Sequence, residues 1–148
     1  MTDVTLLDGL LGGLLATIVM TVFMMTLGDD SPPPTALFYA EYVGDGSPDE
    51  YMMQGMVLHF IYGISAGGAL ALLLILAGID PIDSVEALLA GLSYGVGLFV
   101  GAAVFWMKIV LDMDPEPRDV GLFALFHIVY GLVLGAVIAV GVIGIDLV

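Results

Sequence analysis

The stretch YMMQGMVLHFIYGISAGGALALLLILAGI, from Tyr51 to Ile79, contains no charged side chain. A helix needs about 20 apolar residues to cross a bilayer core of about 30 Å, so this stretch is long enough to span a membrane. Three further stretches share this property: Gly9 to Gly28, Ala87 to Met107 and Val120 to Ile145. Open sheet edges are not tolerated in lipid. The sequence therefore predicts an all-α fold, a bundle of four transmembrane helices in a multi-pass protein of the cell membrane.

The composition agrees with a membrane protein and excludes several other classes. Of the 148 residues, 60% are hydrophobic and 12% are charged, with a mean hydropathy of +1.11, whereas soluble domains are about a quarter charged. The absence of cysteine rules out disulfides, thiolate metal sites and thiol nucleophiles. Sixteen acidic residues face only Lys108 and Arg118, giving a net charge of −14, which excludes a basic nucleic-acid-binding surface. Such acid-rich, lysine-poor surfaces are typical of halophilic proteins, so we expect an archaeal, halophilic source.

Start and stop signals predict where the helices begin and end. The segments 47–50 (SPDE) and 83–86 (DSVE) read as capping boxes that begin the second and third spans. Prolines in the segment 31–34 prevent the first helix from continuing, and we expect the fourth to start just after Pro117. The aromatic segment Thr35 to Val43 predicts a short helix at the membrane interface. An ordered loop over the helix ends is the alternative.

An internal repeat is the most specific feature of the sequence. The segment 59–67 reads HFIYGISAG and the segment 127–135 reads HIVYGLVLG, so both follow H-x-x-Y-G-x-x-x-G and contain the only two histidines. The segments 8–14 (DGLLGGL) and 86–92 (EALLAGL) match more weakly. We therefore expect a single transmembrane domain, 1–148, made of two repeated helical hairpins. Repeat one would be 1–79 and repeat two 80–148, related by a two-fold axis along the membrane normal.

Small residues spaced four apart predict the faces on which the helices pack. The candidate packing glycines are Gly13, Gly63, Gly67, Gly91, Gly131 and Gly135. Because Gly63 and Gly131 belong to the repeated motif, we expect them to tolerate substitution less than Gly141 and Gly144 near the end of the last span.

The paired motifs, the stretch GLLATIVM at 13–20 and the sequence FWM at 105–107 together resemble an uncharacterised family of small four-helix integral membrane proteins of bacteria and archaea. The resemblance covers nearly the whole chain and implies the four-helix fold. It implies no catalytic residue, because no activity is established for that family.

His59 and His127 are candidate functional residues, because an ionisable side chain inside a bilayer is costly and usually faces the interior or a cavity. On the favoured interpretation each histidine hydrogen-bonds a neighbouring helix. The chain is then a non-enzymatic structural or interaction component of the membrane, with lipid and a second copy or another membrane protein as partners. No metal site is predicted, because two histidines supply only half a tetrahedral site.

Two other functions are compatible with the pair. In a haem-binding redox protein, His59 and His127 would ligate haem b from opposite faces, with Tyr62 and Tyr130 one turn away. In a small transporter or proton path, ionisable residues would be staged across the membrane. The stretches Gly9 to Gly28 and Ala87 to Met107 contain none, so this function is ranked last.

Overall fold

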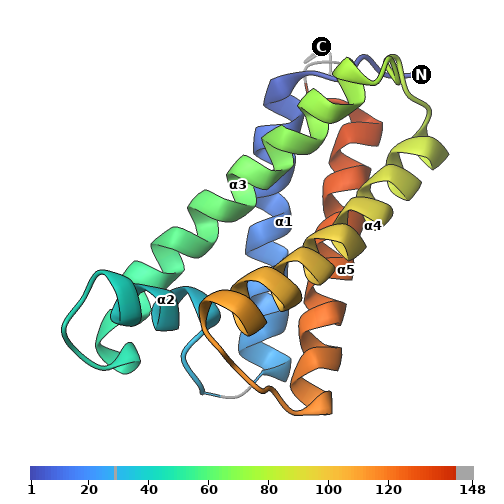
Figure 1. Cartoon of the computed structure of the whole chain (residues 1–148). Coiled ribbons are helices and arrows are strands. Elements are labelled where there is room, and N and C mark those ends of the chain that lie inside the picture. Colours follow the sequence, from blue (N-terminus) through green and yellow to red (C-terminus); the bar gives the residue numbers. More distant parts are fainter. Residues whose placement is uncertain (29, 143–148) are drawn as a thin grey trace.

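The computed structural model describes residues 1–28 and 30–142 of the chain (Figure 1). Its elements are α1 (Leu6–Leu27), α2 (Pro34–Tyr42), the 3-10 turn η1 (Pro48–Tyr51), α3 (Met52–Leu76), α4 (Ser84–Gly101), the π-helical segment η2 (Ala102–Val110) that continues α4, and α5 (Pro117–Val140). Within the described residues, four helical segments are long and apolar enough to cross a membrane: Leu6–Leu27, Pro48–Leu76, Ser84–Val110 and Pro117–Val140. The structure confirms the prediction of an all-α bundle with four helical segments that could span a membrane.

Helix ends follow the predicted signals with two differences. Capping boxes begin α1, η1 and α4, formed by Thr5 and Asp8, by Ser47 and Glu50, and by Asp83 and Glu86. The box of α1 was not predicted. In addition, α5 begins at Pro117 itself. Proline lacks an N–H, but the first residue of a helix has no partner for its N–H in any case, so no hydrogen bond is lost.

The four long helices are arranged with α1 and α5 side by side in the centre (Figure 1). Helix α3 packs on α1, and α4 packs on α5. The outer helices α3 and α4 follow one another in the chain but have few contacts with each other. One hydrogen bond joins them, from the Tyr94 hydroxyl to the Ala66 carbonyl oxygen at 2.9 Å.

Helices α1 and α3 meet through glycine backbone. A Cβ placed on Gly13 would lie 2.7 Å from the carbonyl oxygen of Gly63, and one on Gly9 would lie 2.5 Å from that of Gly67. Backbone atoms cannot rotate away as a side chain can, so any residue larger than glycine here would force the two helices apart.

Helices α4 and α5 meet in the same manner. A Cβ on Gly131 would overlap the carbonyl oxygen of Gly91, and the reverse also holds. A Cβ on Gly135 would lie 2.6 Å from the carbonyl oxygen of Ala87. The outer helices are therefore each held by close backbone contact with one central helix.

Three distant segments are joined at one end of the bundle. The backbones of Thr2 and Ile82 exchange hydrogen bonds of 2.9 and 3.0 Å, and the Thr2 hydroxyl donates to the carbonyl oxygen of Ala139. The Asp8 carboxylate, only 1% exposed, accepts a 2.6 Å hydrogen bond from the Val142 amide. These bonds tie the start of the chain to the α3–α4 turn and to the end of α5.

The same contacts correct the expectation about the glycines near the end of the last span. Gly141 is buried, has φ +69° and would place a Cβ against the Thr2 side chain. A side chain at Gly141 is therefore strained, and the position is not the tolerant control that the sequence suggested. Gly144 lies outside the described residues.

Helix α2 confirms the predicted short helix and bridges two other elements. Ala36 is fully buried against Gly55 of α3, where a Cβ would lie 2.7 Å from the Ala36 backbone nitrogen. On the other side, the Tyr42 hydroxyl donates to the carbonyl oxygen of Val110 at 2.7 Å, and the Phe38 ring packs edge-on against Trp106. Helix α2 thus connects the beginning of α3 to η2.

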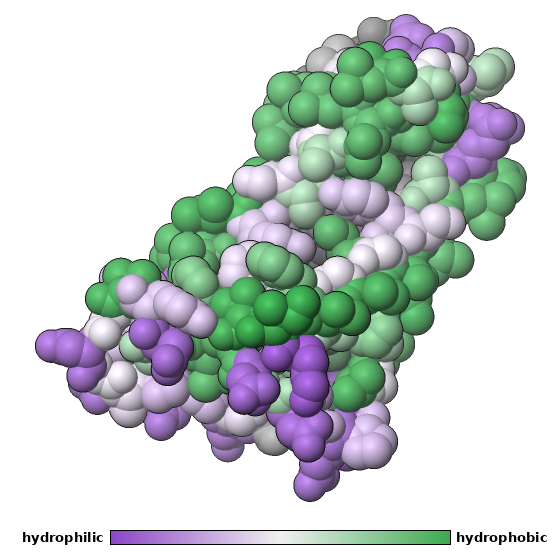
Figure 2. Space-filling view, viewed as in Figure 1, coloured by the Kyte–Doolittle hydropathy of each residue, from purple (hydrophilic) through white to green (hydrophobic). Residues whose placement is uncertain are grey.

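The surface has the distribution expected of a membrane protein. Large apolar side chains are exposed along the helices, among them Val22, Leu73 and Ile109. Figure 2 shows green, hydrophobic sides and purple, hydrophilic ends, with a paler strip between α3 and α4. Four candidate spans with apolar sides indicate an integral membrane protein in contact with the lipid bilayer.

Candidate functional site: a cleft between α3 and α4

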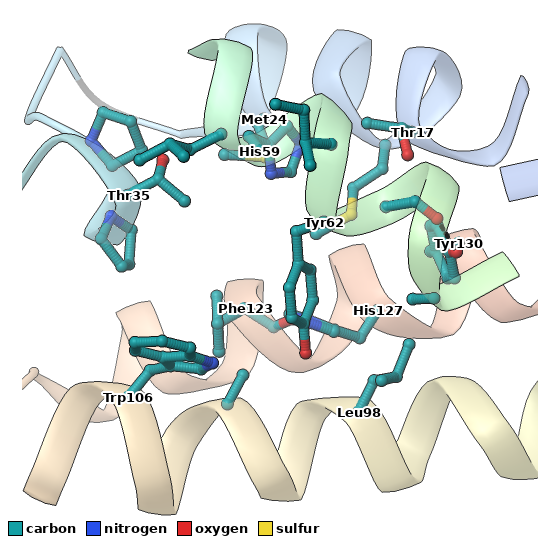
Figure 3. Close-up of a pocket in the computed structure, with 18 of the residues that line it drawn as sticks. Thr17, Met24, Thr35, His59, Tyr62, Leu98, Trp106, Phe123, His127 and Tyr130 are labelled. Carbon is teal, nitrogen blue, oxygen red and sulfur yellow. Dashed lines mark hydrogen bonds between the residues drawn. The ribbon is translucent and has the colours of Figure 1, made fainter. Parts of the chain in front are cut away.

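The separation of α3 and α4 leaves a cleft of about 370 Å³. Its walls are α3 on one side and α4 with η2 on the other, and its floor is formed by α1 and α5 (Figure 3). Residues 33–35 and Phe38 lie at one end, while the Tyr94–Ala66 hydrogen bond joins the walls farther along. The open side faces outward between the two outer helices, where lipid would lie.

All four candidate cofactor-binding residues line this cleft: His59, Tyr62, His127 and Tyr130. Of the candidate packing glycines, Gly63 also borders it. The others, Gly13, Gly67, Gly91, Gly131 and Gly135, lie between the helix pairs, as described above.

His59 is half-buried in the α3 wall. Its Nε2 atom is buried without a hydrogen-bond partner in the described part of the chain, and so is the Thr35 hydroxyl oxygen at the α2 end of the cleft. Buried polar atoms are nearly always hydrogen-bonded, and leaving one unpaired costs about 1–3 kcal/mol. Two residues that line the cleft thus each carry a polar atom whose hydrogen-bonding capacity is not met by the described residues.

His127 is only 5% exposed, and its hydrogen bond stays within its own helix. The Nδ1 atom lies 2.8 Å from the Phe123 carbonyl oxygen. A carbonyl can only accept, so Nδ1 carries the proton and Nε2 is the acceptor of the neutral ring. The Phe123 ring packs edge-on against the imidazole, with the two ring centroids 4.4 Å apart. The expectation that each histidine bonds a neighbouring helix is therefore wrong for the bond that His127 makes.

The hydrogen bonds between helices come from tyrosines. Tyr130, 2% exposed, donates from α5 to the Gly63 carbonyl oxygen of α3 at 2.6 Å, and Tyr94 makes the corresponding bond from α4 to Ala66. The repeated motif predicted Tyr130 as a companion of His127, but nothing in the sequence indicates that the hydroxyls of Tyr130 and Tyr94 bind carbonyl oxygens.

Tyr62 differs from Tyr130, although both occupy the same position of the repeated motif. Tyr62 is 40% exposed and projects from α3 into the cleft (Figure 3). Its hydroxyl makes no hydrogen bond with a described residue. The two tyrosines therefore have separate roles, because Tyr130 fixes the packing of α3 and Tyr62 leaves a free hydroxyl in the cleft.

Trp106, the single tryptophan of the chain, reaches into the cleft from the opposite wall (Figure 3). It belongs to the π-helical segment, in which the amide of Leu111 bonds the Trp106 carbonyl oxygen five residues back at 2.9 Å. Such segments often occur at functional sites. In the sequence, Trp106 stood out only as part of the FWM motif at 105–107. No residue pattern there indicates the change from α- to π-helix.

The residues of the cleft fit haem b only in part. Two imidazoles border one space, which suits axial ligation. Propionates, however, need cationic partners, and no lysine or arginine lines the cleft. The Lys108 side chain is exposed, and its Nζ atom lies 3.7 Å from the Oδ1 atom of Asp114. Within the described residues there is also no group of three or more side chains able to hold a metal ion.

Comparisons of the chain with protein-family models, with curated proteins and with solved structures find no match. No family is identified, and the chain stands as a four-helix protein with four long apolar helices. Its function has to be argued from the cleft.

Proposed function

We propose that this chain is a non-enzymatic component of the cell membrane that binds a small, largely apolar molecule in the cleft between α3 and α4. The observation that carries the proposal is the pair of buried, unpartnered polar atoms, His59 Nε2 and Thr35 Oγ1, at the edge of an otherwise apolar cleft. A concave, mostly apolar space with a few convergent polar groups is the usual form of a small-molecule site. The open side between the outer helices allows a ligand to enter from the bilayer.

We also propose that the hairpins 1–79 and 80–148 are repeats within one domain. A Cβ on Gly13 would meet the carbonyl oxygen of Gly63, as a Cβ on Gly91 would meet that of Gly131. The capping boxes of α1 and α4 also begin at corresponding places, at Thr5 and at Asp83. Both observations support duplication of one hairpin, with the cleft formed where the two hairpins meet.

Haem binding is the second candidate, favoured by the two imidazoles on one cleft and opposed by the lack of cationic residues around it. The visible absorption spectrum of the purified protein tests it, because bis-histidine haem gives a Soret band. A proton path is supported least. Within the described spans, the Asp8 carboxylate lies at one end of the bundle and the histidines lie in the cleft. Along α1, no titratable side chain lies between Asp8 and the cleft that could pass a proton on.

Energy transfer from Trp106 tests whether the cleft binds apolar molecules. The neutral fluorophore N-phenyl-1-naphthylamine, titrated into the protein in lipid bicelles, should accept excitation from this single tryptophan in a saturable manner. Ser65→Phe places a ring in the cleft from an exposed position and should weaken the saturable component at least about fivefold. Leu72→Phe, also exposed on α3 but outside the cleft, is the matched control. Equal transfer in both variants would refute the proposal.

A further inference from the structure

We infer that the occupant of the cleft is a neutral quinone: a flat ring with carbonyl oxygens at opposite edges and an apolar tail. The inference rests on the proposed binding function and adds the chemical class of the ligand. Four properties of the cleft support it: its charge, its hydrogen-bonding groups, its aromatic walls and its position.

The charge of the cleft selects a neutral molecule. No aspartate, glutamate, lysine or arginine is among its lining residues. A phosphate or carboxylate head group inside the cleft would lack a counter-ion, and a buried unpaired charge is strongly unfavourable. Phospholipids and fatty acids could place an acyl chain there but not a head group.

The hydrogen-bonding groups select a ligand that accepts. Tyr62 has a free hydroxyl, Thr35 has a buried unpartnered hydroxyl, and His59 has an unpartnered Nε2 that donates in its Nε2–H tautomer. The indole N–H of Trp106 is a donor only. By contrast, the carbonyl oxygens of Gly63 and Ala66 already accept from tyrosines. Four groups around the cleft can therefore donate, whereas the acceptor-only nitrogen among the described lining residues is His127 Nε2. Quinone oxygens, which only accept, complement these donors.

The walls of the cleft suit a flat ring. Tyr62 projects from α3 and Trp106 from η2, with Phe123 on the floor between them (Figure 3). Aromatic rings prefer offset-stacked or edge-to-face neighbours with centroids about 4.5–7 Å apart. A space of about 370 Å³ lies at the small end of the usual range for ligand sites, about 300–1,000 Å³, and is enough for a bicyclic ring.

The position of the cleft suits a ring with a long tail. The unpartnered donors lie toward α2, near the end of the bundle where α3 begins, and the walls remain apart along the side that would face lipid. A tail can leave sideways between α3 and α4 into the bilayer. The polar ring would then lie between the membrane interface and the midplane, with its tail in hydrocarbon.

Quenching of Trp106 fluorescence tests the inference. The probe is 2-methyl-3-decyl-1,4-naphthoquinone, and its matched control is the decyl-methyl-naphthalene that lacks both carbonyl oxygens. Both are titrated into the full-length protein in lipid bicelles. We expect saturable quenching by the quinone and an affinity at least about tenfold lower for the naphthalene, measured by its competition with the quinone. One to two hydrogen bonds are lost with the carbonyls, and tenfold corresponds to one such bond of ordinary strength.

Variants assign the donors. Tyr62→Phe and His59→Leu should each weaken quinone binding about three- to tenfold, and His59→Gln, which retains a donor, should remain within about threefold of the original. Tyr62 is exposed enough for its variant to fold, so the inference stays testable if the histidine variants do not. Unchanged affinity in Tyr62→Phe and in both histidine variants would overturn the assignment of donors and with it the quinone.

The outcomes separate the two proposals. If the naphthalene binds as tightly as the quinone, or if the quinone does not bind while N-phenyl-1-naphthylamine does, the cleft takes an apolar chain or ring and the quinone inference fails alone. If none of the three molecules gives a saturable signal, the proposed binding function fails as well.

Discussion

Replacing Gly131 with alanine should destabilise the bundle through one specific collision. The new Cβ would overlap the carbonyl oxygen of Gly91 and would lie 3.0 Å from the Cα of Gly95 and 3.1 Å from the carbonyl carbon of Gly91. All three are backbone atoms of α4. The collision can be relieved only if α4 and α5 move apart along their whole contact.

The size of the effect follows from two opposing terms. Overpacking of a close-packed interface costs about 1–3 kcal/mol, and backbone against backbone belongs to the upper part of that range. Alanine is a better helix former than glycine by about 1 kcal/mol. We therefore expect Gly131→Ala to lower the free energy of unfolding by about 1–2 kcal/mol.

Gly97 provides the control, because a Cβ there meets no atom within 4 Å. Gly97→Ala gains the same helix propensity without the collision, so it should be neutral or more stable by up to about 1 kcal/mol. The difference between the two variants cancels the propensity term and should be about 2–3 kcal/mol. Unfolding in mixed micelles by titration with dodecyl sulfate, followed by circular dichroism, measures both. Equal stabilities would refute the assignment of the α4–α5 contact.

Three further predictions concern hydrogen bonds and topology. Tyr94→Phe removes the hydrogen bond that joins the outer helices and should lower stability by about 0.6–1.7 kcal/mol in the same titration, whereas Tyr62→Phe should leave stability unchanged. Asp8→Ala removes a buried carboxylate that accepts from two partly buried amides and should cost about 1–3 kcal/mol. Glu86→Ala, in an exposed capping box, should cost about 0.5–1 kcal/mol, and similar losses would contradict the burial argument. Helix α1 begins and α5 ends at the same end of the bundle (Figure 1). Reporters fused to the two termini should therefore lie on one side of the membrane, and a reporter in the α1–α2 loop on the other. Protease accessibility of the reporters in intact cells measures this.

The four spans could be predicted because charge is so costly in lipid that its absence over a long stretch marks a helix without further information. Caps could be predicted at Ser47 and Asp83 because a side chain and an amide three residues apart suffice to form them. The short helix α2 could be predicted from the aromatic segment Thr35 to Val43, which follows a run of prolines. All of these depend on neighbours in the sequence.

The features that were missed depend on residues far apart in the chain. The sequence does not indicate that Asp8 is buried, because the amide that donates to its carboxylate belongs to Val142, 134 residues away. Gly141 resembled a loosely packed position because neither its positive φ nor its contact with Thr2 is visible in the sequence. The cleft depends on how α3 and α4 diverge, and glycine stripes on every long helix do not determine which helices pair.

The bridge between Tyr94 and Ala66 has a mechanical consequence for the outer helices. From Ala66 back to Met52, α3 extends about 21 Å at about 1.5 Å per residue, and α2 links the beginning of this length to η2. If α2 released its hold on Val110, a tilt of about 10° about the bridge would move the far end of α3 by about 4 Å. That distance is about the separation of two packed carbon atoms, so it admits one further layer of atoms. Helix α2 therefore limits how far the beginning of α3 can separate from η2, while the contacts of Gly63 with α1 and with Tyr130 hold α3 near the bridge.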